Sequence, residues 1–314
     1  MLDISLLGTG GMIPLHNRYL TALLARCNGR MLLIDCGEGT QVTMRELGWG
    51  FVSLDAILFT HFHADHISGL PGMLLSLGNY GRTEPLTIVG PIGVEEVVHG
   101  LRVIAPELPY PIQFMALSFE GKSQEDFLIG DFHLSALPLA HTMPCIGYSI
   151  NIHRAGKFNP QRAMAQHIPV QYWAALQRGH TVAGFTPEMV LGEPRKGIKV
   201  SYITDTRPIH TIPGFVEGSD LFICEGMYGD QRMKHKADGF YHMVFDDAAR
   251  LAKDGNVKEL WLTHYSQALI NPEDHIPKAR NIFENTWAGT DRLTKSFQFV
   301  DQHSSMEPNA LVPR

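Results

Sequence analysis

The segment LFTHFHADHISG at residues 58–69 restricts what this chain can fold into more than any other part of the sequence. It places three histidines and one aspartate within six consecutive positions, namely His61, His63, Asp65 and His66. Imidazole nitrogen and carboxylate oxygen are ligand atoms that zinc and similar divalent ions accept in proteins. His61 and His63 are alternate residues of an extended turn and can face one ion, whereas Asp65 and His66 follow the bend and can face a second. The segment therefore predicts a metal-binding loop.

Three more candidate ligands follow runs of residues that are typical of strands. His141 follows HLSALPLA, Asp205 follows KVSYIT and His264 follows ELWLT, as the loop itself follows DAILF. Loops at the ends of strands are where rigid scaffolds present functional side chains. A single histidine after an apolar run is more often a buried structural residue. Its grouping with the loop favours one shared metal site instead.

The order of the predicted elements indicates the fold class. Short apolar runs bounded by Gly, Pro or Asp recur along the chain and predict strands. Helical spacing of apolar residues predicts helices from Thr40 to Gly48, at 93–105, at 243–255 and at 271–287. The strands come in clusters, with helices between only some of them. This order favours an α/β (α+β) architecture of two packed sheets with outer helices, and not a doubly wound parallel sheet.

Composition places the chain among soluble globular proteins. Its 314 residues are 44% hydrophobic and 18% charged, which is ordinary for such a protein. No apolar run approaches the roughly 20 residues of a membrane span. The N-terminal segment MLDISLLGTGG has no basic region and carries Asp3, so a signal peptide is not expected and a cytoplasmic protein is. Four scattered cysteines without a C-x-x-C pair predict free thiols in a reducing compartment: Cys27, Cys36, Cys145 and Cys224.

Residues 151–200 differ in charge from the rest of the chain. The net charge is −6, yet this stretch carries seven basic and only two acidic residues. Its irregular part, 153–197, contains four prolines and predicts a basic insertion in a single domain at 1–303. Charge asymmetry of this kind indicates a nucleic-acid partner. The alternative is a solvated surface that binds no partner.

An aromatic pair in the insertion has two interpretations, and the end of the chain has one. Tyr172 and Trp173 in the insertion can stack on a nucleic-acid base, or they can form the hydrophobic face of a short helix. The segment 304–314 is polar and aperiodic, and its last four residues, LVPR, look like a protease-site remnant from an expression vector. We therefore expect a disordered tail there, with no part in the fold.

The loop with its continuation, LFTHFHADHISGLPGMLL, resembles the signature loop of the metallo-β-lactamase superfamily. More narrowly, the chain resembles the ribonuclease Z family of tRNA 3′-processing endonucleases. Further segments follow in the order of that family: LLGTGGMIPLHNRYLTALL, MLLIDCGEGTQ, YGRTEPLTIVGPIGV, AHTMPCIGY, YITDTRP, CEGMY and LWLTHYS. The resemblance covers nearly the whole chain. It implies an αββα sandwich of two mixed sheets with a one- or two-zinc site at its edge.

The resemblance also implies a role for each candidate ligand. One zinc would be bound by His61, His63 and His141, and the other by Asp65, His66 and His264, with Asp205 bridging both. The same ligands accept Mn²⁺ or Fe²⁺. Asp35 in LIDCG would orient ligand histidines through their other ring nitrogens. Alternatively, Asp35 only forms the turn at the end of its strand.

A mechanism follows from the same resemblance. Two zinc ions about 3.5–4 Å apart can share a hydroxide that attacks phosphorus, with Asp65 orienting or deprotonating it. Glu225 in CEGMY and His242 in FYHMVF would supply the proton for the leaving 3′-oxygen, with His235 as the rival candidate. Met243 replaces the family's usual small hydroxyl residue, and HYSQAL lacks the customary Arg-Tyr after its serine. These departures concern substrate fit more than metal binding.

Three functions compete on this reading. The leading one is a zinc-dependent phosphodiesterase that cleaves the 3′ trailer of precursor tRNA, working as a homodimer in which one subunit grips the tRNA that the other cuts. The alternative is a hydrolase of small phosphodiesters such as cyclic nucleotides. It is favoured by the acidic remainder of the chain and by the absence of an obvious glycine- and proline-rich arm. A metal-stabilised RNA-binding module without hydrolysis is the third, and the complete set of seven candidate ligands argues against it.

Overall fold

Two compact units make up the part of the chain that is described, residues 1–299 of the computed structural model. The larger comprises Met1–Asn151 and Lys199–Ser296, and the smaller comprises Ile152–Ile198 together with residues 297–299. The small unit thus includes the predicted insertion at 153–197. The predicted tail at 304–314 lies outside the described residues.

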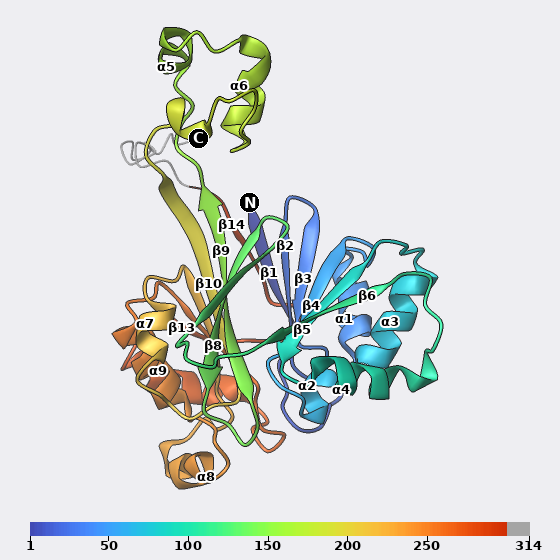
Figure 1. The fold of residues 1–314 in the computed structure, drawn as a ribbon. Coiled ribbons are helices and arrows are strands. Elements are labelled where there is room, and N and C mark those ends of the chain that lie inside the picture. Colours follow the sequence, from blue (N-terminus) through green and yellow to red (C-terminus); the bar gives the residue numbers. More distant parts are fainter. Residues whose placement is uncertain (300–314) are drawn as a thin grey trace, which may run out of the picture. The chain divides into compact units, whose positions relative to one another are not determined.

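Two seven-stranded sheets form the centre of the larger unit (Figure 1). The first has the order β14-β1-β2-β3-β4-β5-β6, with antiparallel pairs at β1–β2–β3 and parallel pairs from β3 to β6. Its strands are β1 (Leu2–Gly8), β2 (Ala22–Cys27), β3 (Arg30–Ile34), β4 (Leu54–Leu58), β5 (Leu86–Pro91), β6 (Ile112–Leu117) and β14 (Thr294–Phe297).

The second sheet is also mixed. Its order is β13-β12-β11-β10-β9-β8-β7, antiparallel from β7 to β9 and parallel from β10 to β13. Its strands are β7 (Glu125–Ile129), β8 (Phe132–Leu139), β9 (Cys145–Arg154), β10 (Arg195–Ile203), β11 (Leu221–Glu225), β12 (Leu260–Thr263) and β13 (Thr286–Ala288). The predicted architecture of two mixed sheets with outer helices is confirmed.

Helices cover the outer face of each sheet (Figure 1). Those on the side of the first sheet are α1 (Thr40–Leu47), α2 (Ala64–Ile67), α3 (Leu70–Asn79) and α4 (Val94–Leu101). Those that follow strands of the second sheet are α7 (Ile212–Val216), α8 (Lys234–Gly239), α9 (Phe245–Asp254) and α10 (Ile276–Arg280). Single 3₁₀ turns lie at η1 (Arg102–Ile104), η3 (Gln231–Met233) and η4 (Pro272–His275). No helix within residues 1–299 is long and apolar enough to cross a membrane.

The helix ends follow from local sequence. The predicted helix from Thr40 to Gly48 is α1, which ends where Gly48 adopts φ 75° and donates its N–H to Met44 and Arg45 carbonyls. A residue without Cβ takes this left-handed conformation easily, which is why glycine so often ends a helix. The predicted end of a helix at Gly255 is the C-cap of α9.

The helix predicted at 271–287 is wrong beyond Arg280. The chain forms η4 and the short α10, and then Thr286–Ala288 joins the second sheet as β13, parallel to β12. The Arg280 side chain donates to the Thr286 carbonyl, 2.9 Å away. Ladder hydrogen bonds to β12 outweigh the helical spacing of this segment, because strand preference depends on partners that are distant in sequence.

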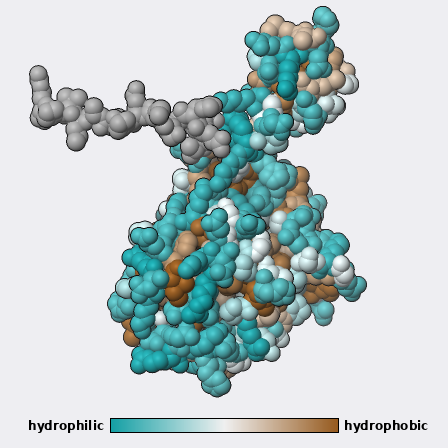
Figure 2. Space-filling view, turned by 90° about the vertical axis from the view of Figure 1, so that its left-hand side faces the viewer, coloured by the Kyte–Doolittle hydropathy of each residue, from teal (hydrophilic) through white to brown (hydrophobic). Residues whose placement is uncertain are grey.

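Separate hydrophobic clusters lie on the outer side of each sheet. Leu33, Ile57 and Ile88 of the first sheet pack with Met44 and Leu74 of the helices. The second cluster joins strands β11 and β12 to helices α7, α9 and α10. Parallel strands that are buried on both faces contain nearly continuous apolar runs, as β3 and β11 do. The surface of the larger unit facing the viewer in Figure 2 is mostly hydrophilic, with scattered hydrophobic residues.

The small unit has its own hydrophobic cluster. It contains α5 (Pro160–Ala165), α6 (Val170–Gln177) and η2 (Pro187–Met189) around four buried residues, Ala163, Ile168, Leu176 and Val190. Tyr172 and Trp173 pack against this cluster, and the Trp173 indole N–H donates to the Ile168 carbonyl at 3.0 Å. Of the two interpretations of these aromatic residues, the hydrophobic face of a helix is the one observed.

Candidate metal centre and catalytic site

The seven candidate ligands meet at the ends of four strands of the larger unit. The loop after β4 and helix α2 carry four of them, and the segments after β8, β10 and β12 carry one each. Their donor atoms form overlapping groups in which all atoms lie within 4.8 Å of one another: His61–His63–His141–Asp205, Asp65–His66–His264 and Asp205–His242–His264. The first two groups match the two sets expected from the sequence, and His242 adds a third that was not expected.

Hydrogen bonds outside the first group fix which ring nitrogens face inward. Thr60 donates its hydroxyl to Asp35 at 2.9 Å, so its oxygen accepts from Nδ1 of His61 at 3.0 Å. The Tyr241 carbonyl accepts from Nδ1 of His141 at 3.3 Å. Both rings therefore turn an Nε2 without hydrogen into the site, which is the form that binds a metal ion.

Distances within this group fit a tetrahedral ion of the size of zinc. Four ligand atoms about 2.0–2.1 Å from such an ion stand roughly 3.3–3.4 Å apart. Here Nδ1 of His63 lies 3.0 Å from Nε2 of His61 and 3.2 Å from Nε2 of His141. Oδ2 of Asp205 lies 3.7 Å from each of those Nε2 atoms. The residues present therefore fit a divalent cation at this position.

Asp205 also faces the second group. Its other oxygen, Oδ1, lies 3.2 Å from Nε2 of His66 and 3.1 Å from Nε2 of His264. Oδ2 of Asp65 lies 3.3 Å from the same His264 nitrogen. Because one carboxylate oxygen of Asp205 serves each group, this side chain has the geometry of a bridging ligand.

Buried Asp35 supports both groups from behind. Its Oδ2 accepts from Nδ1 of His66 at 2.8 Å, and its Oδ1 accepts the Thr60 N–H at 2.8 Å. Asp35, Asp205 and His264 all have positive φ, at 60°, 41° and 56°. Residues with a Cβ rarely adopt this conformation, and it persists at functional sites when the surrounding structure enforces it. The turn after each of these strands is therefore shaped by the site.

Electrostatics favour the cation-binding forms of His61, Asp65 and Asp205, whereas His66 behaves differently: burial lowers its pKa, but Asp205 and Asp35 raise it well above 6.5. Burial lowers the pKa of His61 well below its usual 6.5, so its ring is neutral at pH 7. Burial would raise the pKa of Asp205, but His264, His66 and His61 around it hold that pKa well below the usual range. Asp65 has its pKa lowered in the same way, against burial, by His264 and His66. Both carboxylates are anionic at neutral pH.

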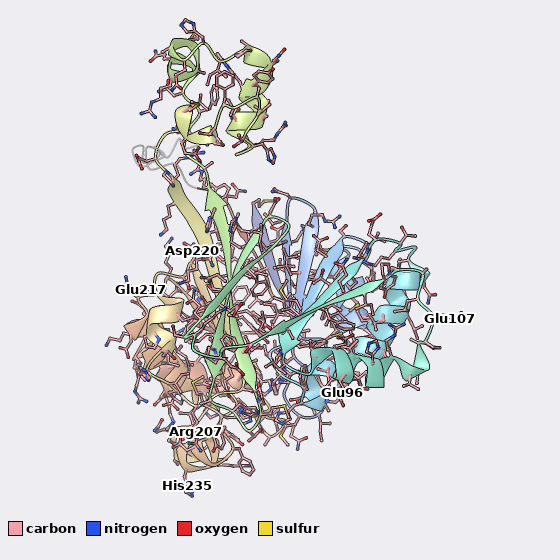
Figure 3. All side chains as sticks on the ribbon, in the orientation of Figure 1. Glu96, Glu107, Arg207, Glu217, Asp220 and His235 are labelled. Carbon is pink, nitrogen blue, oxygen red and sulfur yellow. The ribbon has the colours of Figure 1, made fainter. Side chains whose placement is uncertain are left out.

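His242 of the third group forms a pair with Glu225. Nδ1 of His242 donates to Oε2 of Glu225 at 3.1 Å, and the backbone N–H groups of Thr206 and Met243 donate to the same carboxylate at 2.7 and 3.2 Å. Burial lowers the pKa of His242, but Glu225, together with Asp205 and Asp65, raises it to about 9. His235, the rival candidate, is exposed on α8 (Figure 3) and belongs to none of these groups.

A cavity of about 520 Å³ opens onto members of the two groups and onto His242. Its walls come from residues on both sheets' loops, among them Asp65, His141, Asp205, His242 and His264. Ser266, Gln267 and Ala268 of the HYSQAL segment also line it. The buried Met243 does not line it, although its N–H binds Glu225. Metal ligands and His242 thus line one and the same cavity.

Sequence reasoning missed three supporting groups. These are the hydroxyl of Thr60, the backbone N–H of Thr206 and the carbonyl of Tyr241. Thr60 and Thr206 are immediate neighbours of proposed ligands, so their position in sequence was an available signal. The Tyr241 carbonyl gives no such signal, because its contact with His141 joins residues that are 100 positions apart.

We expect metal removal to lower the melting temperature. Buried ligands lose a compensating cation, and an ion present at 100 times its dissociation constant stabilises a fold by about 2.7 kcal/mol. For a chain of 314 residues that corresponds to roughly 4 °C. Differential scanning calorimetry before and after chelation, and after addition of Zn²⁺, checks this. Equal melting temperatures in all three samples would contradict a metal held by the folded protein.

Comparison with known proteins places these residues in a family. The chain is 51% identical over 303 residues to a protein named ribonuclease Z from Lachnoclostridium phytofermentans, covering 95% of this chain and 99% of that one. It is 50% identical over 305 residues to ribonuclease Z from Clostridium kluyveri, covering 96% and 100%. A family model described as "Anti-Pycsar protein Apyc1" matches residues 2–99.

Solved structures agree on the fold. The short form of human tRNase Z superposes with a TM-score of 0.68 at 22% identity, covering 95% of this chain and 100% of that one. The metallo-β-lactamase fold protein YhfI from Bacillus subtilis has a TM-score of 0.68 at 20% identity, covering 94% and 98%. Half of all aligned residues are shared with the bacterial relatives over nearly the full length, and this chain belongs to the ribonuclease Z family of the metallo-β-lactamase fold.

Proposed function

We propose that this protein is a metal-dependent endoribonuclease that removes the 3′ trailer of precursor tRNA. One observation carries the proposal: a cavity that is lined both by a two-group metal centre and by a carboxylate-supported histidine. Hydrolysis of a phosphodiester requires a nucleophile on one side of phosphorus and a proton donor on the other. Relatives about half identical to this chain are named ribonuclease Z, and this supports RNA as the substrate.

The donor atoms are of the kinds that Zn²⁺ prefers. Two such divalent ions would supply a hydroxide nucleophile at neutral pH and neutralise the phosphate charge. His61, His63 and His141 would hold the first ion, His66, Asp65 and His264 the second, and Asp205 would bridge them. Asp65 is also suited to orient the attacking oxygen and accept its proton. The Met12 N–H donates to its Oδ2 at 2.7 Å and holds the carboxylate in place.

His242 is the proposed general acid. Its Nδ1 binds Glu225, which leaves Nε2–H free to protonate the leaving 3′-oxygen as the phosphorus–oxygen bond breaks. The Glu225 carboxylate stabilises the imidazolium form and fixes its orientation. His242 would thus be protonated at neutral pH, when the proton is needed. The products would be a 3′-hydroxyl on the tRNA and a 5′-phosphate on the trailer.

The small unit, residues 152–198, is proposed to contact the RNA backbone. Lys157, Arg162 and Arg178 are exposed on it, and lysine and arginine bind phosphates without regard to sequence. In this reading the chain is one catalytic domain with an RNA-binding insertion. A homodimer in which one subunit grips the tRNA cut by the other would suit such an insertion. The four buried free cysteines support a reducing, cytoplasmic location.

The proposal is tested with a precursor tRNA that carries a 3′ trailer. Zinc-loaded protein is incubated with it and the product ends are mapped, with chelated protein and bis-p-nitrophenyl phosphate in parallel. A single cut next to the discriminator base, lost on chelation, is the expected result. Hydrolysis of the small ester with intact tRNA would instead establish the small-phosphodiester function. Metal binding without hydrolysis of either would indicate a binding module.

We expect the triple variant Lys157→Ala, Arg162→Ala, Arg178→Ala to bind precursor tRNA more weakly without losing chemistry. KM should rise while kcat stays unchanged, and the salt dependence of log KM should weaken by up to about 2–3 in slope. Steady-state kinetics from 50 to 300 mM salt measure both quantities. Hydrolysis of bis-p-nitrophenyl phosphate is the control and should be unaffected. An unchanged KM for tRNA would rule these residues out as RNA contacts.

A further inference from the structure

Arg207 connects two segments of the site that lie far apart in sequence. Its backbone N–H donates to the Ala140 carbonyl at 3.1 Å, directly before His141. Its Nε–H donates to the Asp238 carbonyl at 3.1 Å, and its guanidinium carbon lies 3.6 Å from the centre of the Tyr241 ring. Figure 3 shows Arg207 close to helix α8, between that helix and the rest of the unit. The guanidinium is therefore engaged by the segment that leads to His242.

Tyr241 has a conformation that needs support. Its φ is 61°, in the left-handed region that is unfavourable for an aromatic residue. This conformation directs its carbonyl to Nδ1 of His141 at 3.3 Å. The next residue, His242, then lies with Nδ1 3.1 Å from Glu225. One strained peptide thus serves both a candidate metal ligand and the candidate general acid.

We propose that Arg207 and Tyr241 are positioning residues that hold this peptide. The stacked guanidinium stabilises the left-handed backbone at Tyr241, and the bond to Asp238 anchors the preceding turn. The Tyr241 carbonyl then keeps the hydrogen of His141 on Nδ1, so that Nε2 faces the metal site. The role of His242 in this inference rests on the proposed function, whereas the effect on His141 does not.

The first test compares two substitutions of Tyr241. Glycine adopts positive φ without cost and alanine does not, so Tyr241→Gly should retain more function than Tyr241→Ala. We expect Tyr241→Ala to weaken Zn²⁺ binding at one of two sites by roughly 10–100-fold, as loss of a ligand's outer partner does. It should also lower kcat by about 10²-fold with little change in KM. If Tyr241→Gly has a Zn²⁺ affinity and a kcat equal to or lower than those of Tyr241→Ala, the proposal is wrong.

The second test concerns Arg207, with Arg232 as the matched control. Among the described residues, the Arg232 side chain binds the neighbouring Asp230 alone, and it is 89% exposed. We expect Arg207→Ala to reproduce the losses of Tyr241→Ala. Arg207→Lys should recover part of them, because lysine keeps the charge but not the planar stacking surface. Arg232→Ala should change neither kcat nor Zn²⁺ affinity. If Arg207→Ala instead raises KM alone and weakens its salt dependence, Arg207 contacts phosphate and the proposal is wrong.

Zn²⁺ affinity, measured by competition with a chromogenic chelator on the full chain, separates this inference from the proposed function. Suppose that the wild-type protein leaves precursor tRNA intact while Zn²⁺ affinity decreases from wild type to Tyr241→Gly to Tyr241→Ala. In that case the positioning of His141 stands and the tRNA function fails. Should the wild-type protein cut tRNA while all Tyr241 and Arg207 variants bind Zn²⁺ like wild type, the function stands and the positioning role fails.

Discussion

The Asp65→Ala variant is expected to lose precursor tRNA cleavage by about 10³-fold or more. Its carboxylate is both a candidate ligand, 3.3 Å from Nε2 of His264, and the group best placed to handle the proton of the attacking oxygen. Losing a metal ligand and a general base in one substitution removes more transition-state stabilisation than either alone. Single-turnover cleavage of a trailer-bearing tRNA measures the rate of the chemical step, and elemental analysis measures the bound metal.

Asp65→Asn is the matched control for shape. The amide can still accept the Met12 N–H, which is 2.7 Å from Asp65 in the wild-type chain, but it has no charge and no basic oxygen. We therefore expect Asp65→Asn to be nearly as inactive as Asp65→Ala while melting closer to the wild-type temperature. A fully active Asp65→Asn enzyme would remove Asp65 from the proposed mechanism.

Changing the Glu225–His242 pair is expected to give the second largest effect, with a characteristic pH dependence. Burial lowers the pKa of His242, but Glu225, together with Asp205 and Asp65, raises it to about 9, so the wild-type ring carries a proton below that pH and loses it above. In Glu225→Gln the strongest of these raising charges is gone and burial remains, so the pKa falls. The basic limb of the pH–rate profile should move to lower pH.

Because the pKa of His242 falls in Glu225→Gln, the loss of activity should be larger at high pH than at low pH. At pH 6 the Glu225→Gln enzyme still holds a protonated His242 in part and should lose roughly tenfold in kcat. At pH 8.5 the loss should exceed about 10²-fold, because each unit of lowered pKa reduces the protonated fraction tenfold. His242→Ala should lose activity at every pH and show no basic limb. A Glu225→Gln profile parallel to that of the wild type would exclude His242 as the acid that Glu225 controls.

Local signals account for the elements that were predicted well. Helix α1 ends at Gly48, which adopts the left-handed conformation, and α9 ends at Gly255, just before Asn256 with φ 47°. The metal loop is local in the same sense: four ligands within six residues need only a turn to bring them together. Strand β13 has three residues and depends on β12 as a partner. The local spacing of its apolar residues therefore predicts a helix, which is wrong.

The sequence by itself determined the strand-and-loop pattern, the chemistry of the ligand set and, through family resemblance, the pairing of Glu225 with His242. Only the tertiary structure decided how each ring is turned. Asp205 offers a different oxygen to each ligand group, and the Tyr241 carbonyl sets the hydrogen on His141 from 100 residues away. Ligand identity is a property of side-chain chemistry, whereas tautomer and bridging geometry depend on contacts between strand ends that only folding brings within hydrogen-bond distance.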